Sequence, residues 1–141
     1  MELPSDIYGQ LEELSNAGND LVDDENYSLA IGKWMEALTL LPEPKSDWEA
    51  YTWLSASIGD TYYQLEKFEE ARHALFNALN GPDGQSNPFI HYRLGQCNDR
   101  LGLESIEHLL QAYMLDGERI FGENEDGMML LQKLKDRNMI P

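Results

Sequence analysis

Residues 58–79 read IGDTYYQLEKFEEARHALFNAL, and residues 17–38 read AGNDLVDDENYSLAIGKWMEAL. When Gly18 is aligned with Gly59, residues of the same kind coincide at five positions along the two stretches. Glycine and alanine are typical of points where two helices touch, because only small side chains let the backbones approach closely. We expect the aromatic residue of each stretch to fill the turn between two helices. The stretches therefore predict two copies of one helical hairpin. The matching pairs, each 41 residues apart, are Gly18 and Gly59, Tyr27 and Phe68, Ala30 and Ala71, Ala37 and Ala78, and Leu38 and Leu79.

A third and more divergent unit begins at Leu94-Gly95 and reaches Ala112. The interval from its glycine to its alanine is 17 residues, whereas the same interval is 19 residues in the first two units. This difference predicts a turn two residues shorter inside the third hairpin.

Apolar residues recur three or four positions apart almost throughout the chain, which is typical of amphipathic helices and predicts an all-α fold. The prolines of segment 42–47 end one helix, and Asn87-Pro88 is typical of the start of another. A last apolar stripe predicts a helix over residues 126–138 that covers the end of the array. A non-repeating helical bundle is the alternative. The stripe consists of Met128, Leu131 and Leu134.

The composition is strongly acidic: 141 residues include 26 Asp and Glu against 10 Lys and Arg, for a net charge of −16. Binding to nucleic acid or to an anionic membrane needs clustered cations, so the charge argues against both. A basic protein partner would instead be attracted. Residues 1–32 contain eight acids and no Lys or Arg. The charge also has a simpler interpretation, which is solubility alone.

The cellular compartment is indicated by what the sequence lacks. Cys97 is the single cysteine, so the chain forms no internal disulfide, as expected in a reducing environment. The first ten residues lack the basic and apolar regions of a signal peptide. No apolar run approaches the roughly 20 residues that cross a bilayer. We therefore expect a cytoplasmic protein.

No spacing typical of an enzyme or a metal site occurs in the sequence. The histidines His73, His91 and His108 stand apart, and Cys97 has no recognisable His partner, which predicts a buried and inert thiol. The acids of segment 20–25 lack the ligand ladder and central glycine of a calcium loop. We expect no catalytic residue, no metal and no cofactor.

The order of these positions resembles the tetratricopeptide repeat (TPR) family, whose unit places W-x-x-L-G-x-x-Y before A-x-x-x-F and a terminal proline. The resemblance covers roughly residues 10–117, although the spacing of 41 exceeds the family's roughly 34. The matching motifs are Ile58-Gly59-x-x-Tyr62 with Ala71-x-x-x-Leu75, then Ala17-Gly18-x-x-Leu21 with Ala30-x-x-x-Trp34 and Pro42, and finally Leu94-Gly95 with Ala112, where Asn98 takes the tyrosine position.

The resemblance implies one domain, 1–141, of antiparallel helix hairpins stacked in a right-handed array. Its units would span about 10–42, 48–83 and 88–117, with a capping helix at about 126–138. In this family the first helix of each hairpin lines a concave binding face. Mapped residue by residue, with the acids of the first hairpin added, the resemblance implies a protein-binding surface made of Asn16, Asn19, Asp20, Asp23, Asp24, Trp53, Asp60, Tyr63, Phe89, Tyr92, Arg93 and Gln96.

Trp53, Tyr63 and Tyr92 would be the aromatic anchors of this surface. The alternative is that Trp53 and Phe89 are buried by the extended linker or by the last helix.

The function implied is protein binding without catalysis. The segment Tyr113–Gly117 (YMLDG) with the acidic residues after it is similar to small TPR-like immunity proteins of bacterial polymorphic toxins. We therefore expect an acidic inhibitor of a basic toxin. The alternative is a small acidic TPR secretion chaperone that binds an extended segment of its client, and an enzyme is the third class.

Overall fold

The computed structural model describes residues 2–122 and 125–141 of the chain. These residues form helices and no β-strand, so the all-α fold class is confirmed. None of the helices in the described part is long and apolar enough to cross a bilayer. The elements are α1 (Ser5–Asp23), α2 (Tyr27–Thr39), the 3-10 helix η1 (Lys45–Asp47), α3 (Glu49–Gln64), α4 (Phe68–Leu79), α5 (Pro88–Arg100), α6 (Ile106–Asp116), the 3-10 helix η2 (Arg119–Gly122) and α7 (Glu125–Asp136).

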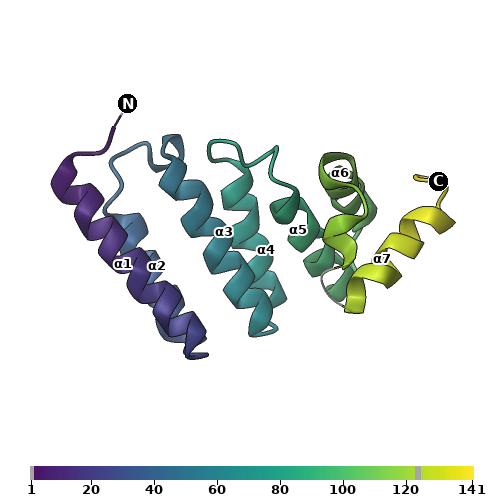
Figure 1. The fold of residues 1–141 in the computed structure, drawn as a ribbon, viewed down its shortest axis with the longest axis horizontal. Helices are drawn as coiled ribbons and strands as arrows, with labels where there is room; N and C mark the ends of the chain where they lie inside the picture. Colours follow the sequence, from purple (N-terminus) through teal and green to yellow (C-terminus); the bar gives the residue numbers. More distant parts are fainter. Residues whose placement is uncertain (1, 123–124) are drawn as a thin grey trace.

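The helices follow one another along the long axis of the molecule, from α1 at one end to α7 at the other (Figure 1). Helices adjacent in sequence are also adjacent in space. The closest pairs are α1 with α2, α3 with α4, and α5 with α6, and contacts of α2 with α3 and of α4 with α5 join them. The fold is thus a row of helix hairpins in which each hairpin packs on the next.

The glycines of the repeat mark the closest contacts inside the hairpins. A Cβ atom added at Gly18 would overlap the indole of Trp34, and one added at Gly59 would lie 2.6 Å from Leu75 Cγ. Trp34 and Leu75 are themselves 41 residues apart. The first two hairpins therefore make the same contact at equivalent positions, as the aligned sequences predict.

The third hairpin differs in its turn, and the predicted shortening is wrong. Five residues, 101–105, connect α5 to α6, whereas three residues connect the helices of the first two hairpins. Gly95 packs under Leu109, the fourth residue of α6, with an added Cβ only 2.5 Å from Leu109 Cδ2. The equivalent contacts fall on the eighth residues of α2 and α4. A longer turn and a contact one helical turn earlier together produce the shorter interval in sequence.

The connection between α2 and α3, residues 40–48, is a packed part of the fold rather than a loose linker. Lys45 Nζ donates a hydrogen bond to the backbone oxygen of Leu41 at 2.7 Å. Trp48 Nε1 donates to the backbone oxygen of Pro42 at 2.8 Å. Leu41 is buried, and Trp48 packs half-buried against the core of the first hairpin and α3. This segment carries the chain across to the start of α3.

The last helix, α7, packs on η2 and α6 through a face that includes Leu131 and Leu134 of the predicted stripe but not Met128. Its inward side carries Gly127, Leu130, Leu131 and Leu134, and these three leucines are buried. Met128, predicted in the apolar stripe, is 62% exposed. The shift occurs because Gly127, which has no side chain, lies directly against the backbone of η2 and so fixes the rotation of the helix.

Candidate protein-binding groove

A groove opens between the N-terminal end of the chain, η1 and the first half of α3. We call it the N-terminal groove, and its volume is about 880 Å³. This volume lies within the range of sites that hold ligands. Its floor is apolar and its rim carries acids. The lining residues are Glu2, Leu3, Ser5, Tyr8, Leu11, Asp47, Trp48, Glu49, Ala50, Trp53 and Pro82.

Two aromatic side chains in this groove remain open to solvent. Tyr8 on α1 is 56% exposed and Trp53 on α3 is 43% exposed. The indole N–H groups of Trp34 and Trp48 donate to backbone oxygens at 3.4 and 2.8 Å. Trp53, by contrast, stands at the groove surface. The alternative that the linker or the last helix buries Trp53 and Phe89 is therefore wrong for Trp53, whereas Phe89 is half-buried against a core cluster that includes leucines of α7.

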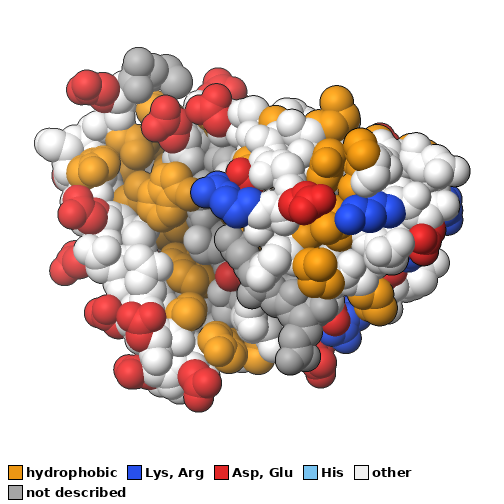
Figure 2. Space-filling view, turned by 45° about the vertical axis from the view of Figure 1, so that its right-hand side comes forward, with side chains coloured by type: hydrophobic (Ala, Val, Ile, Leu, Met, Phe, Trp, Pro, Cys, Tyr) orange, Lys and Arg blue, Asp and Glu red, His pale blue; other side chains and the backbone are white. Residues whose placement is uncertain are grey.

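Two of the acids that line the N-terminal groove, Asp47 and Glu49, have no ion-pair partner in the described part of the chain. No Lys or Arg is among the residues that line it. Asp47 and Glu49 are exposed, and neither forms an ion pair with a described residue. Glu49 stands four residues before Trp53 on α3, so the two side chains share one face of the helix. Figure 2 shows acidic side chains along the left-hand edge, where the N-terminal helices lie, with hydrophobic side chains exposed beside them.

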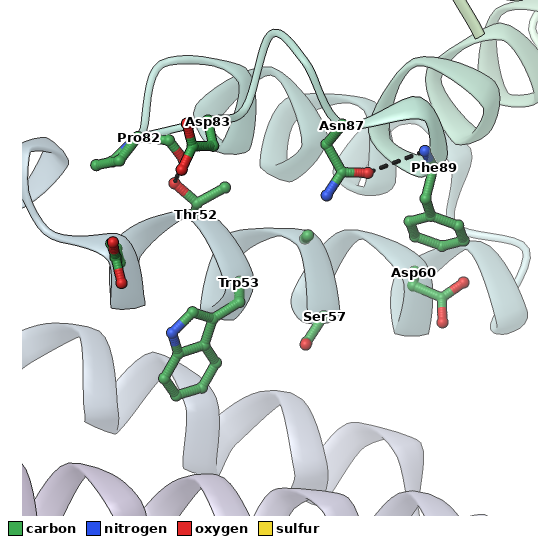
Figure 3. A pocket seen from close by; sticks show the side chains of 10 residues that line it. Thr52, Trp53, Ser57, Asp60, Pro82, Asp83, Asn87 and Phe89 are labelled. Atoms are coloured by element: carbon green, nitrogen blue, oxygen red, sulfur yellow. Dashed lines mark hydrogen bonds between the residues drawn. The ribbon is translucent and has the colours of Figure 1, made fainter. Parts of the chain in front are cut away.

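A second hollow of about 420 Å³ adjoins the groove across Trp53 and is shown in Figure 3. Trp53 and Ser57 project from one side of α3, while Thr52 points toward Pro82 in the loop before α5. Thr52 Oγ1 donates to the backbone oxygen of Pro82 at 2.8 Å, which holds this loop on α3. Asn87 caps α5 as predicted, because its Oδ1 accepts from the backbone N–H of Phe89 at 2.9 Å.

The structure brings five of the predicted site residues together, but as a closed cluster. Arg93 donates to Asp60 Oδ1 through Nε at 2.9 Å and through Nη2 at 2.8 Å. Its Nη1 donates to Gln96 Oε1 at 2.7 Å, and its guanidinium lies 4.3 Å from the ring centre of Tyr63 and 5.2 Å from that of Phe89. The carboxylate of Asp60, the guanidinium of Arg93 and the amide oxygen of Gln96 are therefore engaged within the molecule, whereas the buried Gln96 Nε2 has no hydrogen-bond partner among the described residues.

The expectation that Tyr92, Arg93 and Gln96 are exposed on a concave face is wrong. All three are buried, with Tyr92 only 2% exposed. Tyr92 packs edge-on against Phe121 of η2 at 5.1 Å between ring centres, in a core cluster that includes leucines of α7. The C-terminal segment folds back over α5 and covers the face that the third unit was expected to present.

The polar residues predicted on the first hairpin are exposed but lie away from the groove. The α1 residues that line the groove end at Leu11, and Asp20 follows nine positions later, about 14 Å along a helix with a rise of 1.5 Å per residue. None of these first-hairpin residues lines the N-terminal groove or the adjoining hollow. They are Asn16, Asn19, Asp20, Asp23 and Asp24, and all are exposed. The predicted surface is thus divided into an acidic end and an aromatic groove.

Two of the histidines are not isolated, contrary to the prediction. His91 Nδ1 lies 3.3 Å from His108 Nδ1, and His91 Nε2 lies 2.9 Å from the backbone oxygen of Gln85. A carbonyl only accepts, so His91 Nε2 carries a proton and donates it to Gln85, and His108 donates to His91 Nδ1. Burial, with the neighbouring His91 as a second cause, lowers the pKa of His108 from 6.5. The pair joins α5 to α6 and ties down the loop before α5.

The single cysteine is enclosed in the core. Cys97 is fully buried, and burial raises the pKa of its thiol to about 12. Among residues 2–122 and 125–141, no group of three or more His, Cys, Asp or Glu side chains is arranged to hold a metal ion.

Tyr8, Asp47 and Glu49 are groove residues that the sequence reasoning did not single out. Glu49 had a signal, its spacing of four from Trp53, but Tyr8 and Asp47 lie just outside the predicted repeat units. No model of a known protein family matches the chain, and no curated protein matches it in sequence.

Proposed function

We propose that this chain is a TPR-like scaffold that binds another protein without catalysing a reaction, and that it is an acidic immunity-type inhibitor of a basic bacterial toxin in the cytoplasm. The N-terminal groove is the observation that carries the proposal. It exposes Tyr8 and Trp53 beside the carboxylates of Asp47 and Glu49, which have no ion pair with a described residue. Exposed aromatics with adjacent polar groups are the usual hot spots of protein interfaces.

A basic partner is favoured by the charge of the whole chain as well as by the groove. The net charge is −16, and the first 32 residues carry eight acids and no Lys or Arg. Such a field raises the rate at which a basic partner associates. A toxin that acts on nucleic acid needs a cationic face for phosphate. An acidic protein is suited to cover that face.

The second candidate, a secretion chaperone, is supported by the apolar floor of the same groove. Leu3, Leu11 and Ala50 line it, and its volume of about 880 Å³ accommodates several residues of an extended chain. A chaperone would bind an unfolded segment of its client. An inhibitor would bind a folded domain.

The test uses the protein encoded by the adjacent reading frame, produced with and without this chain in the same cells. An inhibitor is expected to relieve growth arrest caused by that protein and to form a stable complex with its folded domain. Binding to an extended segment alone, with no relief of toxicity, supports the chaperone instead. Absence of binding to the folded protein and to its segments contradicts both candidates.

Kinetics measured by surface plasmon resonance at two salt concentrations separate the two parts of the surface. Changing Asp20, Asp23 and Asp24 together to Asn should slow association, with an effect that fades as salt rises. Trp53→Ala should speed dissociation roughly tenfold, as expected for a hot spot worth about 1.4 kcal/mol. If the association and dissociation rates change neither with salt nor in these two variants, the interface lies elsewhere on the chain.

A further inference from the structure

We propose that the N-terminal groove recognises an arginine side chain that the folded partner presents, held against Tyr8 and Trp53 with its charge neutralised by Asp47 and Glu49. This inference rests on the proposed function and names the chemistry that the partner must supply. The occupant is a side chain of a protein rather than a free small cation.

The aromatic side chains provide the first part of the argument. Tyr8 and Trp53 come from different helices, α1 and α3, and both line the same groove with much of their surface exposed. The face of an aromatic ring attracts a cation, and tryptophan does so most strongly. A planar cation that enters the groove therefore finds an aromatic face on each of the two helices.

The carboxylates provide the second part. Asp47 precedes α3 and Glu49 is its first residue, so both stand within two turns of Trp53. With no Lys or Arg among the described residues that line the groove, a cation brought in by a partner would meet carboxylates of Asp47 and Glu49 that form no ion pair with a described residue. A positively charged side chain from the partner would therefore be attracted to these two carboxylates.

The chain itself shows which cation fits such surroundings. Arg93 lies over Tyr63 and Phe89 while it donates two hydrogen bonds to Asp60. The other cation–π contacts among the described residues are also made by arginines, Arg72 and Arg100. A guanidinium is flat and donates in the plane of the group, so it stacks on rings and bonds carboxylates at once. The ammonium of lysine cannot do both equally well.

The probe is a fluorescein-labelled hexapeptide of alternating arginine and alanine, added to the full chain. The comparison peptide carries citrulline, which has the shape of arginine without its charge. Fluorescence anisotropy gives the dissociation constant, and the three tryptophan indole N–H signals in a ¹⁵N NMR spectrum give the location. The arginine peptide should shift the Trp53 signal and leave Trp34, which is buried, bonded internally and not among the groove residues, in place.

Variants test the contacts one kind at a time. Asp47→Asn with Glu49→Gln should weaken binding of the arginine peptide about fivefold to tenfold, because two exposed charges are removed. Trp53→Leu keeps an apolar side chain without a π-face and should weaken binding roughly fivefold. The matched control, Glu36→Gln with Glu107→Gln, removes the same charge from exposed positions on α2 and α6 that line neither the groove nor the adjoining hollow.

Three outcomes would overturn the inference: equal binding of the citrulline peptide, equal weakening by the control pair, or binding of spermidine as tight as that of the peptide. Failure here is distinct from failure of the proposed function. If the adjacent-frame protein forms its complex and tolerates the Asp47, Glu49 and Trp53 variants, the scaffold function stands and the arginine site is refuted.

Discussion

Gly59→Ala tests the contact on which the repeat depends. The added methyl group would lie 2.6 Å from Leu75 Cγ, 2.9 Å from Leu75 Cδ2 and 3.2 Å from the backbone oxygen of Ala71. Leu75 is completely buried, so its side chain has no solvent to move into. The helices α3 and α4 must therefore separate, or the side chain must leave its preferred rotamer.

Two opposing effects set the magnitude. Replacing a glycine inside a helix by alanine stabilises it by up to about 1 kcal/mol, because the unfolded chain loses backbone freedom. Overpacking a filled core costs about 1–3 kcal/mol. Gly59→Ala should therefore lower the free energy of unfolding by up to about 2 kcal/mol. Gly32 on α2 is the matched control, because an added Cβ there meets nothing within 4 Å, so Gly32→Ala should show the gain alone.

Urea unfolding followed by circular dichroism measures both variants against the parent chain. A Leu75→Ala background supplies the second control: with the leucine removed, Gly59→Ala should recover the gain of roughly 1 kcal/mol. If Gly59→Ala stabilises the protein as much as Gly32→Ala does, the helices do not touch at Gly59 and the reasoning is refuted.

Ala71→Leu and Ala30→Leu, at completely buried and equivalent positions, should each destabilise the fold by about 1–3 kcal/mol, and unchanged urea midpoints would contradict the repeat alignment. Cys97, with a pKa near 12, should react with a thiol reagent only as fast as the chain unfolds; rapid labelling of the native protein would show that the thiol is accessible. The pKa of His108 is lowered from 6.5 on folding, so the unfolded chain takes up that proton first as the pH falls. The free energy of unfolding should then decrease below about pH 6.5 and level off once folded His108 is protonated, a step that His108→Gln should abolish in urea titrations at several pH values.

The first two hairpins were accessible to sequence reasoning because their signals are local and repeated. Gly18 and Gly59 recur with the large residue that covers each of them, so both partners of the contact are visible in one alignment. The start of α5 was equally accessible, since Asn87 acts on N–H groups only two and three residues away. Contacts between residues that are close in sequence, or that recur in each repeat, can be predicted without knowing the tertiary structure.

The third unit was less predictable because its surroundings are set by residues far downstream. Helical periodicity shows that Tyr92 and Arg93 lie on a helix, but it does not show that η2 and α7 pack over Tyr92 or that Arg93 pairs with Asp60 of α3. The pairing of His91 with His108 depends on a turn two residues longer than in the other hairpins. The family resemblance predicted a third unit whose first helix is exposed to a partner, but η2 and α7 pack against that helix at Tyr92.

The two halves of the predicted binding face therefore differ in what they can offer a partner. In the second half, the carboxylate of Asp60 is already neutralised by Arg93, and the rings of Tyr63 and Phe89 are already covered by its guanidinium. A partner that bound Asp60 in place of Arg93 would leave a largely buried guanidinium without its carboxylate, which is unfavourable. In the first half, Trp53 and Glu49 are exposed at no such cost, because nothing in the described chain has to be displaced. A partner can therefore bind at the N-terminal groove without displacing internal contacts. Asp60, Tyr63 and Phe89 match the expected family positions equally well but already contact Arg93.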